Sequence, residues 1–68
     1  MKLTITSKEL EILRKSVYGL SAEQIANELR ISDREVQLAL KSILKNTHCK
    51  EPLQAMQALA KNGFYISA

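Results

Sequence analysis

The side chains best suited to recognise a ligand lie between Ser32 and Lys50. Arg34 can bind a guanine base or a phosphate through two parallel hydrogen bonds, and Lys41 and Lys45 are suited to phosphate contacts. This segment holds four basic residues against two acidic ones, a net charge of +2 out of +3 for the whole chain. The pattern indicates a mildly basic surface of the kind that contacts nucleic acid.

Two charged positions at the start of this segment each have a second explanation. Arg34 is favoured as a DNA contact, but it could also be a solvated side chain beside Asp33. Glu35 lies three residues after Ser32, so its carboxylate is favoured to fold back onto the Ser32 backbone N–H and cap a helix. The alternative is that Glu35 accepts a hydrogen bond from cytosine N4.

The next residues extend the same surface without charge. Gln37 can read an adenine through its amide or simply remain in solvent. Leu38 lies about 200° around a helix from Val36, so we expect it to be exposed if Val36 is buried. In a major groove, Leu38 or Ala39 could pack against a thymine methyl group.

Other kinds of site have little support in the sequence. His48 and Cys49 are adjacent but have no further ligands at metal-binding spacing, so we interpret them as structural and expect no metal and no cofactor. A 68-residue chain has little room for a substrate cleft, and we expect no enzyme activity. No apolar run is long enough to span a bilayer, which predicts a soluble cytoplasmic protein that does not bind membranes.

The positions of helix-starting and helix-ending residues predict four helices. Three begin where a Ser or Thr is followed three residues later by Glu or Gln, an arrangement that satisfies the unpaired backbone donors of the first turn. A fourth begins at Pro52, and Gly19 and Gly63 are predicted to act as equivalent C-caps. The predicted helices cover residues of about 7–18, 22–29, 33–47 and 52–62.

The fold class that follows is all-α, a compact four-helix unit that forms a single domain over residues 1–68. On the first helix we expect Leu10, Leu13 and Val17 to face the core. Residues 2–6 alternate polar and apolar side chains, but five residues cannot form a sheet by themselves. We therefore predict an N-terminal arm there.

The second and third helices are predicted to form a helix-turn-helix over residues 22–41. The small side chain of Ala26 allows the two helices to approach closely, and the angle between them makes the third helix project outward. Such a helix fits the major groove of duplex DNA. The residues expected to form the shared core are Ile25, Leu29, Ile31, Val36 and Leu40.

From about Ile5 to Phe64 the chain resembles the LuxR/GerE-type DNA-binding domain of bacterial transcription regulators. The similarity lies in the opening block of residues 5–13, the turn and second helix at residues 19–21 and 24–29, the recognition helix, and the fourth helix with its closing glycine at residues 55–63. The resemblance implies a LuxR C-terminal-domain-like fold. The alternative is another helix-turn-helix, such as the C-terminal segment of a sigma factor, which usually lacks the fourth helix.

The recognition helix departs from the family pattern at its polar positions. Where the family usually has Thr-Val-Lys, any residue and His, this chain has residues 35–39, Glu-Val-Gln-Leu-Ala. Val36 is kept, while Glu35 adds a negative charge and Gln37 replaces a cation. The usual electrostatic affinity for DNA is therefore partly missing.

The resemblance also implies that the fourth helix pairs with its twin when two copies bind adjacent half-sites on DNA. The residues expected at this homodimer contact are Leu53, Met56, Gln57 and Ala60. The alternative is that Leu53 and Met56 only close a small core.

The sequence is compatible with two functions. The favoured one is a sequence-specific transcription regulator that binds double-stranded DNA, or the output domain of such a regulator, through Arg34, Glu35, Gln37, Leu38, Lys41 and Lys45. The alternative is a protein-interaction module that has lost DNA binding and pairs with a partner regulator protein through the fourth helix. Glu35, Gln37 and Ala39 argue for the alternative, and the remaining cations argue against it.

Overall fold

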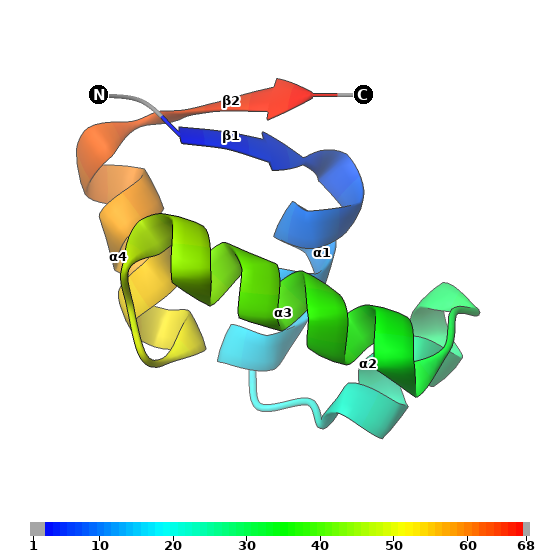
Figure 1. Cartoon of the computed structure of the whole chain (residues 1–68). Coiled ribbons are helices and arrows are strands. Elements are labelled where there is room, and N and C mark those ends of the chain that lie inside the picture. Colours follow the sequence, from blue (N-terminus) through cyan, green and yellow to red (C-terminus); the bar gives the residue numbers. More distant parts are fainter. Residues whose placement is uncertain (1–2, 68) are drawn as a thin grey trace.

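The computed structural model describes residues 3–67 and confirms the four predicted helices (Figure 1). The helices also lie close to their predicted bounds. Two short strands, one at each end of the described chain, were not predicted. In chain order the elements are β1 (Leu3–Thr6), α1 (Ser7–Val17), α2 (Ala22–Leu29), α3 (Asp33–Thr47), α4 (Pro52–Asn62) and β2 (Phe64–Ser67).

The first two helices begin at the reciprocal caps that the sequence predicts. At α1, the Thr6 hydroxyl accepts from the Glu9 backbone N–H and the Glu9 carboxylate accepts from the Thr6 N–H, both at 3.0 Å. At α2, Ser21 and Gln24 exchange the same two hydrogen bonds at 3.2 and 2.8 Å. Each cap satisfies two backbone donors that a helix leaves unpaired, so both helix starts are determined by local sequence.

The N-terminal arm predicted for residues 2–6 is wrong over its described part, because residues 3–6 form β1. This strand pairs in parallel with β2, and the register places Leu3 opposite Phe64 and Ile5 opposite Ile66. Figure 1 shows the two strands side by side at one edge of the molecule. A five-residue segment cannot form a sheet alone, but here its partner comes from the other end of the chain. Lys2, the first residue of the predicted arm, lies outside the described residues.

Gly63 makes this pairing possible. It caps α4 as predicted, with its N–H donating to the Leu59 carbonyl at 2.8 Å, but its φ of 79° and ψ of 163° differ from the left-handed helical cap expected by analogy with Gly19. This backbone region is essentially restricted to glycine. Gly63 therefore turns the chain directly from α4 into the extended β2.

The core consists of two clusters that meet at α1. The adjacent α1 residues Ile12 and Leu13 are both fully buried, but they face different clusters. The predicted core residues Leu10 and Val17 of the same helix are only partly buried. The buried members of the cluster around the sheet and α4 are Ile5, Leu13, Ile43, Ala55 and Leu59. Those of the cluster between α1, α2 and α3 are Ile12, Ile25, Ala26 and Val36.

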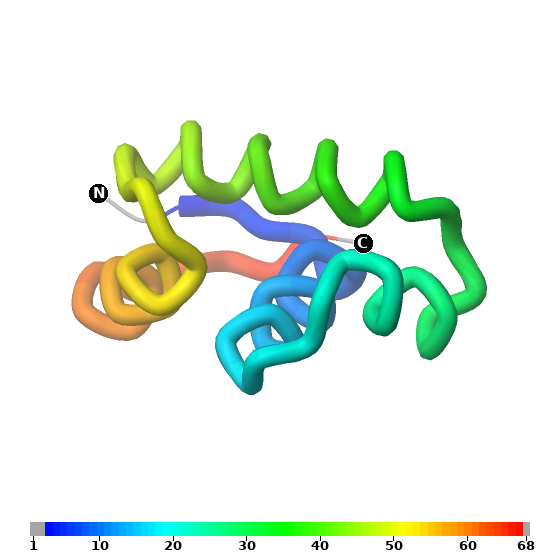
Figure 2. The backbone as a smooth tube through the Cα atoms, turned by 90° about the horizontal axis from the view of Figure 1, so that it is seen from below, coloured from blue at the N-terminus to red at the C-terminus, as the bar shows by residue number. Residues whose placement is uncertain are grey.

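The second cluster confirms the predicted core of the helix-turn-helix. Ile25 and Val36 are completely buried in it, and partly buried Leu29, Ile31 and Leu40 pack around them. As a result α3 is held by its inner side only. Figure 2 shows α3 running along one side of the molecule, and no other helix or strand of residues 3–67 covers its outer side. None of the helices between residues 3 and 67 has the length and hydropathy needed to cross a bilayer.

We predict that Ile5→Ala lowers the free energy of unfolding by at least about 2 kcal/mol, because Ile5 is only 4% exposed and its removal leaves a cavity beside Leu13 and Leu59. Urea unfolding followed by circular dichroism measures the effect. Thr4→Ala, an exposed position on the same strand, is the matched control and should change stability by less than about 0.5 kcal/mol. Equally small effects of the two substitutions would mean that residues 3–6 do behave as a loose arm.

Candidate nucleic-acid interface

The uncovered side of α3 carries one continuous stripe of exposed side chains. Its members follow helical spacing of three or four residues, so they share a face. Four of them, Arg34, Gln37, Leu38 and Lys41, line a single shallow, open depression. Leu38 is 54% exposed, which confirms its predicted exposure. The stripe, which we call the α3 stripe, consists of Arg34, Gln37, Leu38, Lys41 and Lys45.

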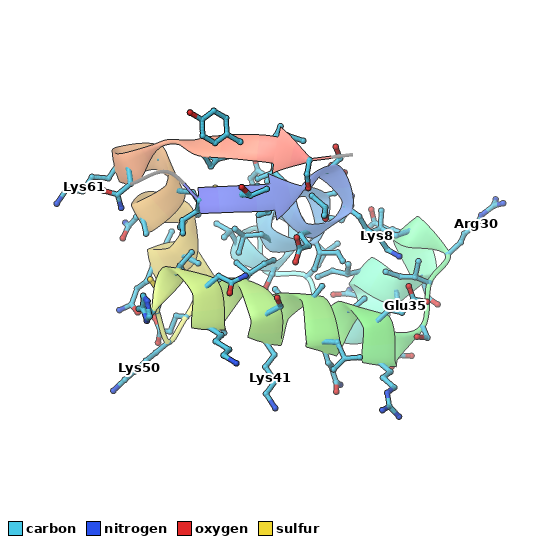
Figure 3. The ribbon with its side chains drawn as sticks, turned by 45° about the horizontal axis from the view of Figure 1, so that its top comes forward. Lys8, Arg30, Glu35, Lys41, Lys50 and Lys61 are labelled. Carbon is cyan, nitrogen blue, oxygen red and sulfur yellow. The ribbon has the colours of Figure 1, made fainter. Side chains whose placement is uncertain are left out.

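The cations of the α3 stripe have no acidic partner in the part of the chain that the structure describes. Within residues 3–67, no ion pair or side-chain hydrogen bond involves Arg34, Lys41 or Lys45. In Figure 3, Lys41 projects away from the body of the molecule, and Lys50, from the loop after α3, projects on the same side. The positive charge on this side of the protein is therefore available to an anionic ligand.

Glu35 is not part of the α3 stripe. The Ser32 hydroxyl accepts from the Glu35 backbone N–H at 3.1 Å, as in a cap, but the Glu35 carboxylate does not return to the Ser32 N–H. Instead Oε2 of Glu35 accepts a hydrogen bond from Nζ of Lys8 on α1 at 2.7 Å (Figure 3). The predicted reciprocal cap at Ser32 is therefore only half formed, because a lysine from another helix competes for the carboxylate.

This contact changes the acidity of Glu35. The hydrogen bond from Lys8 and its positive charge hold the pKa of the Glu35 carboxyl below its usual value. Both side chains remain about half exposed, at 54% for Lys8 and 51% for Glu35. The carboxylate is thus charged at neutral pH but already neutralised by its partner.

Ala39 is also removed from the groove-facing set. It is partly buried and packs against the cluster that contains Ile25 and Val36. Of the two residues expected to meet a thymine methyl group, the structure therefore leaves only Leu38 on the outer side of α3. The absence of the family's histidine at position 39 removes no side chain from the α3 stripe.

His48 and Cys49 have structural positions, as the sequence interpretation expects. His48 ends α3 with a φ of 57°, and the Cys49 backbone N–H donates to the Leu44 carbonyl at 3.0 Å. Cys49 is partly buried against the cluster that contains Ile43. Within residues 3–67, no three His, Cys, Asp or Glu side chains are grouped as a metal site would require.

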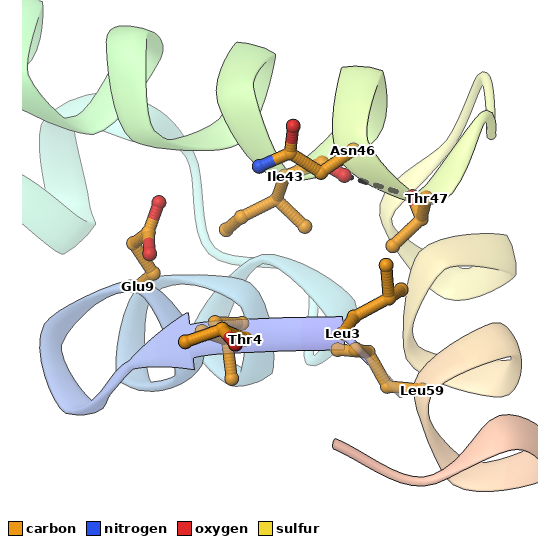
Figure 4. Close-up of a pocket in the computed structure, with 8 residues that line it drawn as sticks. Leu3, Thr4, Glu9, Ile43, Asn46, Thr47 and Leu59 are labelled. Atoms are coloured by element: carbon orange, nitrogen blue, oxygen red, sulfur yellow. Dashed lines mark hydrogen bonds between the residues drawn. The ribbon is translucent and has the colours of Figure 1, made fainter. Parts of the chain in front are cut away.

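A small pocket lies between β1 and the second half of α3 (Figure 4). The Thr47 hydroxyl at its edge donates to the Ile43 carbonyl at 2.8 Å. Its volume of about 10 Å³ is close to that of one water molecule, so it has no room for an organic ligand. The lining residues are Leu3, Thr4, Ile5, Glu9, Ile43, Asn46, Thr47 and Leu59.

The residues expected at a dimer contact divide between two surfaces of α4. Leu53, Gln57 and Ala60 are exposed and lie at spacings of four and three residues, so they share one face. Leu53 is 52% exposed, which is high for a large apolar side chain. Met56 is instead partly buried against the core and lines an open groove with Leu10 of α1 and Phe64 of β2, among other residues.

Lys8 is the residue of this region that sequence reasoning missed. It lies 27 positions from Glu35 in the chain, on a helix with no predicted role in the site. The signal within the sequence was limited to the local cap pattern around Glu35, which pointed to Ser32. Only the packing of α1 against α3 brings the ammonium group to this carboxylate.

Comparison with known proteins agrees with this geometry. The family model GerE, described as bacterial regulatory proteins of the luxR family, matches residues 3–59 and so includes the whole helix-turn-helix. The chain belongs to this LuxR family. The family confirms the prediction of a helix-turn-helix transcription regulator domain of the LuxR type, and it does not favour the alternative of an interaction module that has lost DNA binding.

The LuxR-family chain is also similar to a curated protein. The uncharacterized transcriptional regulatory protein YxjL of Bacillus subtilis (strain 168) is 34% identical over 58 residues, which cover 85% of this chain and 27% of that protein. The chain thus spans about a quarter of the length of this relative. No solved structure gave a significant match.

We predict that the Lys8–Glu35 contact stabilises the fold at neutral pH and that this contribution disappears in acid. The pKa of Glu35 is lower in the folded than in the unfolded state, so its contribution is present above the unfolded pKa and is lost as the pH falls through the folded one. The difference in urea midpoint between the natural chain and Lys8→Met should therefore shrink between pH 7 and about pH 3. Lys41→Met, which removes an unpaired lysine, is the control, and a Lys8→Met difference that stays constant with pH would contradict the prediction.

Proposed function

We propose that this chain is a sequence-specific DNA-binding domain that places α3 in the major groove, and that it is the output domain of a transcription regulator. The observation that carries the proposal is the α3 stripe, whose cations are unpaired and lie on the uncovered side of the second helix of a helix-turn-helix. The family and the curated relative support the same function.

The dimensions of α3 suit this role. An α-helix with its side chains is about 10–12 Å across, and the major groove is about 12 Å wide. In helix-turn-helix proteins the first turns of the recognition helix meet the base edges, which makes Arg34, Gln37 and Leu38 the candidates for reading sequence. Lys41 and Lys45 lie further along the helix, and we expect them to contact phosphates.

Glu35 belongs to the proposed interface in a different way from its neighbours. With one carboxylate oxygen bonded to Lys8, it faces α1 and lies at the edge of the α3 stripe. Its proposed role is therefore electrostatic and does not include direct reading of a cytosine. This also accounts for a Glu where the family usually has a neutral threonine, because Lys8 cancels its charge.

Since the chain spans about a quarter of the curated relative, we include in the proposal that a longer regulator uses this domain as its DNA-binding part. We also propose that the domain acts in the cytoplasm, where bacterial DNA lies. The proposed domain needs no cofactor and no catalytic step to perform this role.

We further propose that two copies pair through Leu53, Gln57 and Ala60 of α4 when they occupy adjacent half-sites. The support is the high exposure of Leu53 on a face that nothing covers among residues 3–67. Met56 is placed to support this face from the core side and to hold α4 against α1. The contact is small, so we expect it to form on DNA and not in free solution.

The first prediction concerns the α3 stripe. Binding to a fluorescent random-sequence duplex of about 25 base pairs should show a Kd of about 10⁻⁴–10⁻⁶ M that weakens steeply with salt. The double substitution Arg34→Ala and Lys41→Ala should weaken binding and lower the slope of log K against log salt by about 2. On a duplex of random sequence, where Arg34 has no selected base to read, we expect both cations to neutralise phosphates. Fluorescence anisotropy at several salt concentrations measures both quantities.

The matched control removes two exposed cations elsewhere, with Arg14→Ala and Lys61→Ala. Lys61 lies at the far end of the molecule from the start of α3 (Figure 3), and the change in net charge is the same. This control should reduce the salt slope much less than the α3 variant. Equal reductions, or no binding by the natural chain even at low salt, would contradict the proposed function.

The second prediction concerns α4. Leu53→Glu should abolish cooperative binding of two copies to a duplex with two selected half-sites, because it buries a carboxylate in the paired face. Binding to a single half-site should stay within about twofold, as the residue is remote from the α3 stripe. Gln54→Glu changes the charge equally on the neighbouring face of α4 and should keep cooperativity. If Leu53→Glu still bound the two half-sites cooperatively, α4 would not form the contact between the two copies.

A further inference from the structure

The Lys8–Glu35 pair lies at the edge of the proposed interface. Successive helix positions are separated by about 100°, so Glu35 lies about a quarter turn from Arg34, on the α1 side of the α3 stripe. A helix that fills the major groove has phosphates along both of its flanks, since its diameter is close to the groove width. Glu35 and Lys8 therefore occupy the flank where a phosphate chain would pass.

At that flank the pair contributes no net charge. The ammonium of Lys8 is engaged by the Glu35 carboxylate at 2.7 Å, while both groups remain about half exposed to solvent. Without Glu35, Lys8 would be an exposed cation next to the first turn of α3, similar to the unpaired Arg34. Each cation that neutralises a phosphate increases affinity for DNA of any sequence by releasing a counterion.

We propose that Glu35 is an affinity attenuator, which holds Lys8 away from the phosphates and so lowers the sequence-independent part of DNA binding. This inference rests on the proposed function and adds to it two residues whose role is to set the strength of non-specific binding. The chain then depends more on the base contacts of Arg34, Gln37 and Leu38 for its affinity. Because a sequence-independent contact strengthens binding to every site, holding Lys8 back lowers the affinity for all DNA and leaves the discrimination between sites to the base contacts.

The test measures non-specific binding of the full chain to a random 25-base-pair duplex by anisotropy across a salt series. Glu35→Gln keeps the side-chain shape and releases Lys8. It should tighten binding by about fivefold to tenfold near 0.1 M salt and raise the salt slope by about 1. The double variant Glu35→Gln with Lys8→Met should return both quantities to those of the natural chain.

The chain contains a closely matched control for the change in net charge. Glu28 on α2 is 52% exposed and pairs with Lys15 of α1 at 3.0 Å, and Lys15 also pairs with Glu11 at 3.7 Å. Glu28→Gln therefore removes the same charge from an ion pair that does not involve α3, and it leaves Lys15 paired with Glu11. It should change affinity by less than about twofold. Thermal unfolding of every variant by circular dichroism verifies that all of them remain folded under the assay conditions.

The possible results separate this inference from the function on which it rests. Binding by the natural chain with no gain in Glu35→Gln, or with an equal gain in Glu28→Gln, overturns the attenuator alone. A gain that survives the addition of Lys8→Met also overturns it, because released Lys8 would not be the cause. No binding by either the natural chain or Glu35→Gln at low salt overturns the proposed function and the attenuator together.

Discussion

The architecture depends on the burial of α1 on two sides. Ile12 and Leu13 are adjacent in the chain, yet one packs against the helix-turn-helix and the other against α4 and the sheet. Because adjacent helix positions differ by about 100°, two neighbouring apolar side chains can serve two clusters. Each cluster contains only four or five buried residues, so neither would be stable without α1, which contributes a fully buried residue to each.

This arrangement leaves α3 with one buried side and one uncovered side. Val36 and Ile43 hold the inner side, one in each cluster, and Leu40 contacts both. The orientation of α3 is therefore determined at two points along its length. Side chains on its outer side do not pack in the core, so charged residues there have little effect on the free energy of unfolding. The same separation allows the polar positions of the recognition helix to differ from the family pattern while the core remains that of the family.

The sequence predicts the features of this molecule that depend on residues close together in the chain. The caps at Thr6 and Ser21 and the start of α4 at Pro52 are local, and all three are found where expected. The β1–β2 pair and the contact of Lys8 with Glu35 were missed, because their partners are far apart in the chain and meet only through packing of the helices. Residues of the α3 stripe could be selected from spacing alone, whereas the exclusion of Glu35 and Ala39 from it required the fold.

The parallel sheet has a consequence for how the domain folds. Leu3 and Phe64 pair across almost the whole described chain, so forming this contact closes a loop that contains all four helices. The entropy of that closure is offset only when the intervening helices have already shortened the distance between the strands. We therefore expect the helices to form early through local contacts and the strands to join last. Backbone amide protection in β1 and β2 reports completion of the native state, and a circular dichroism signal from helices reports an earlier event.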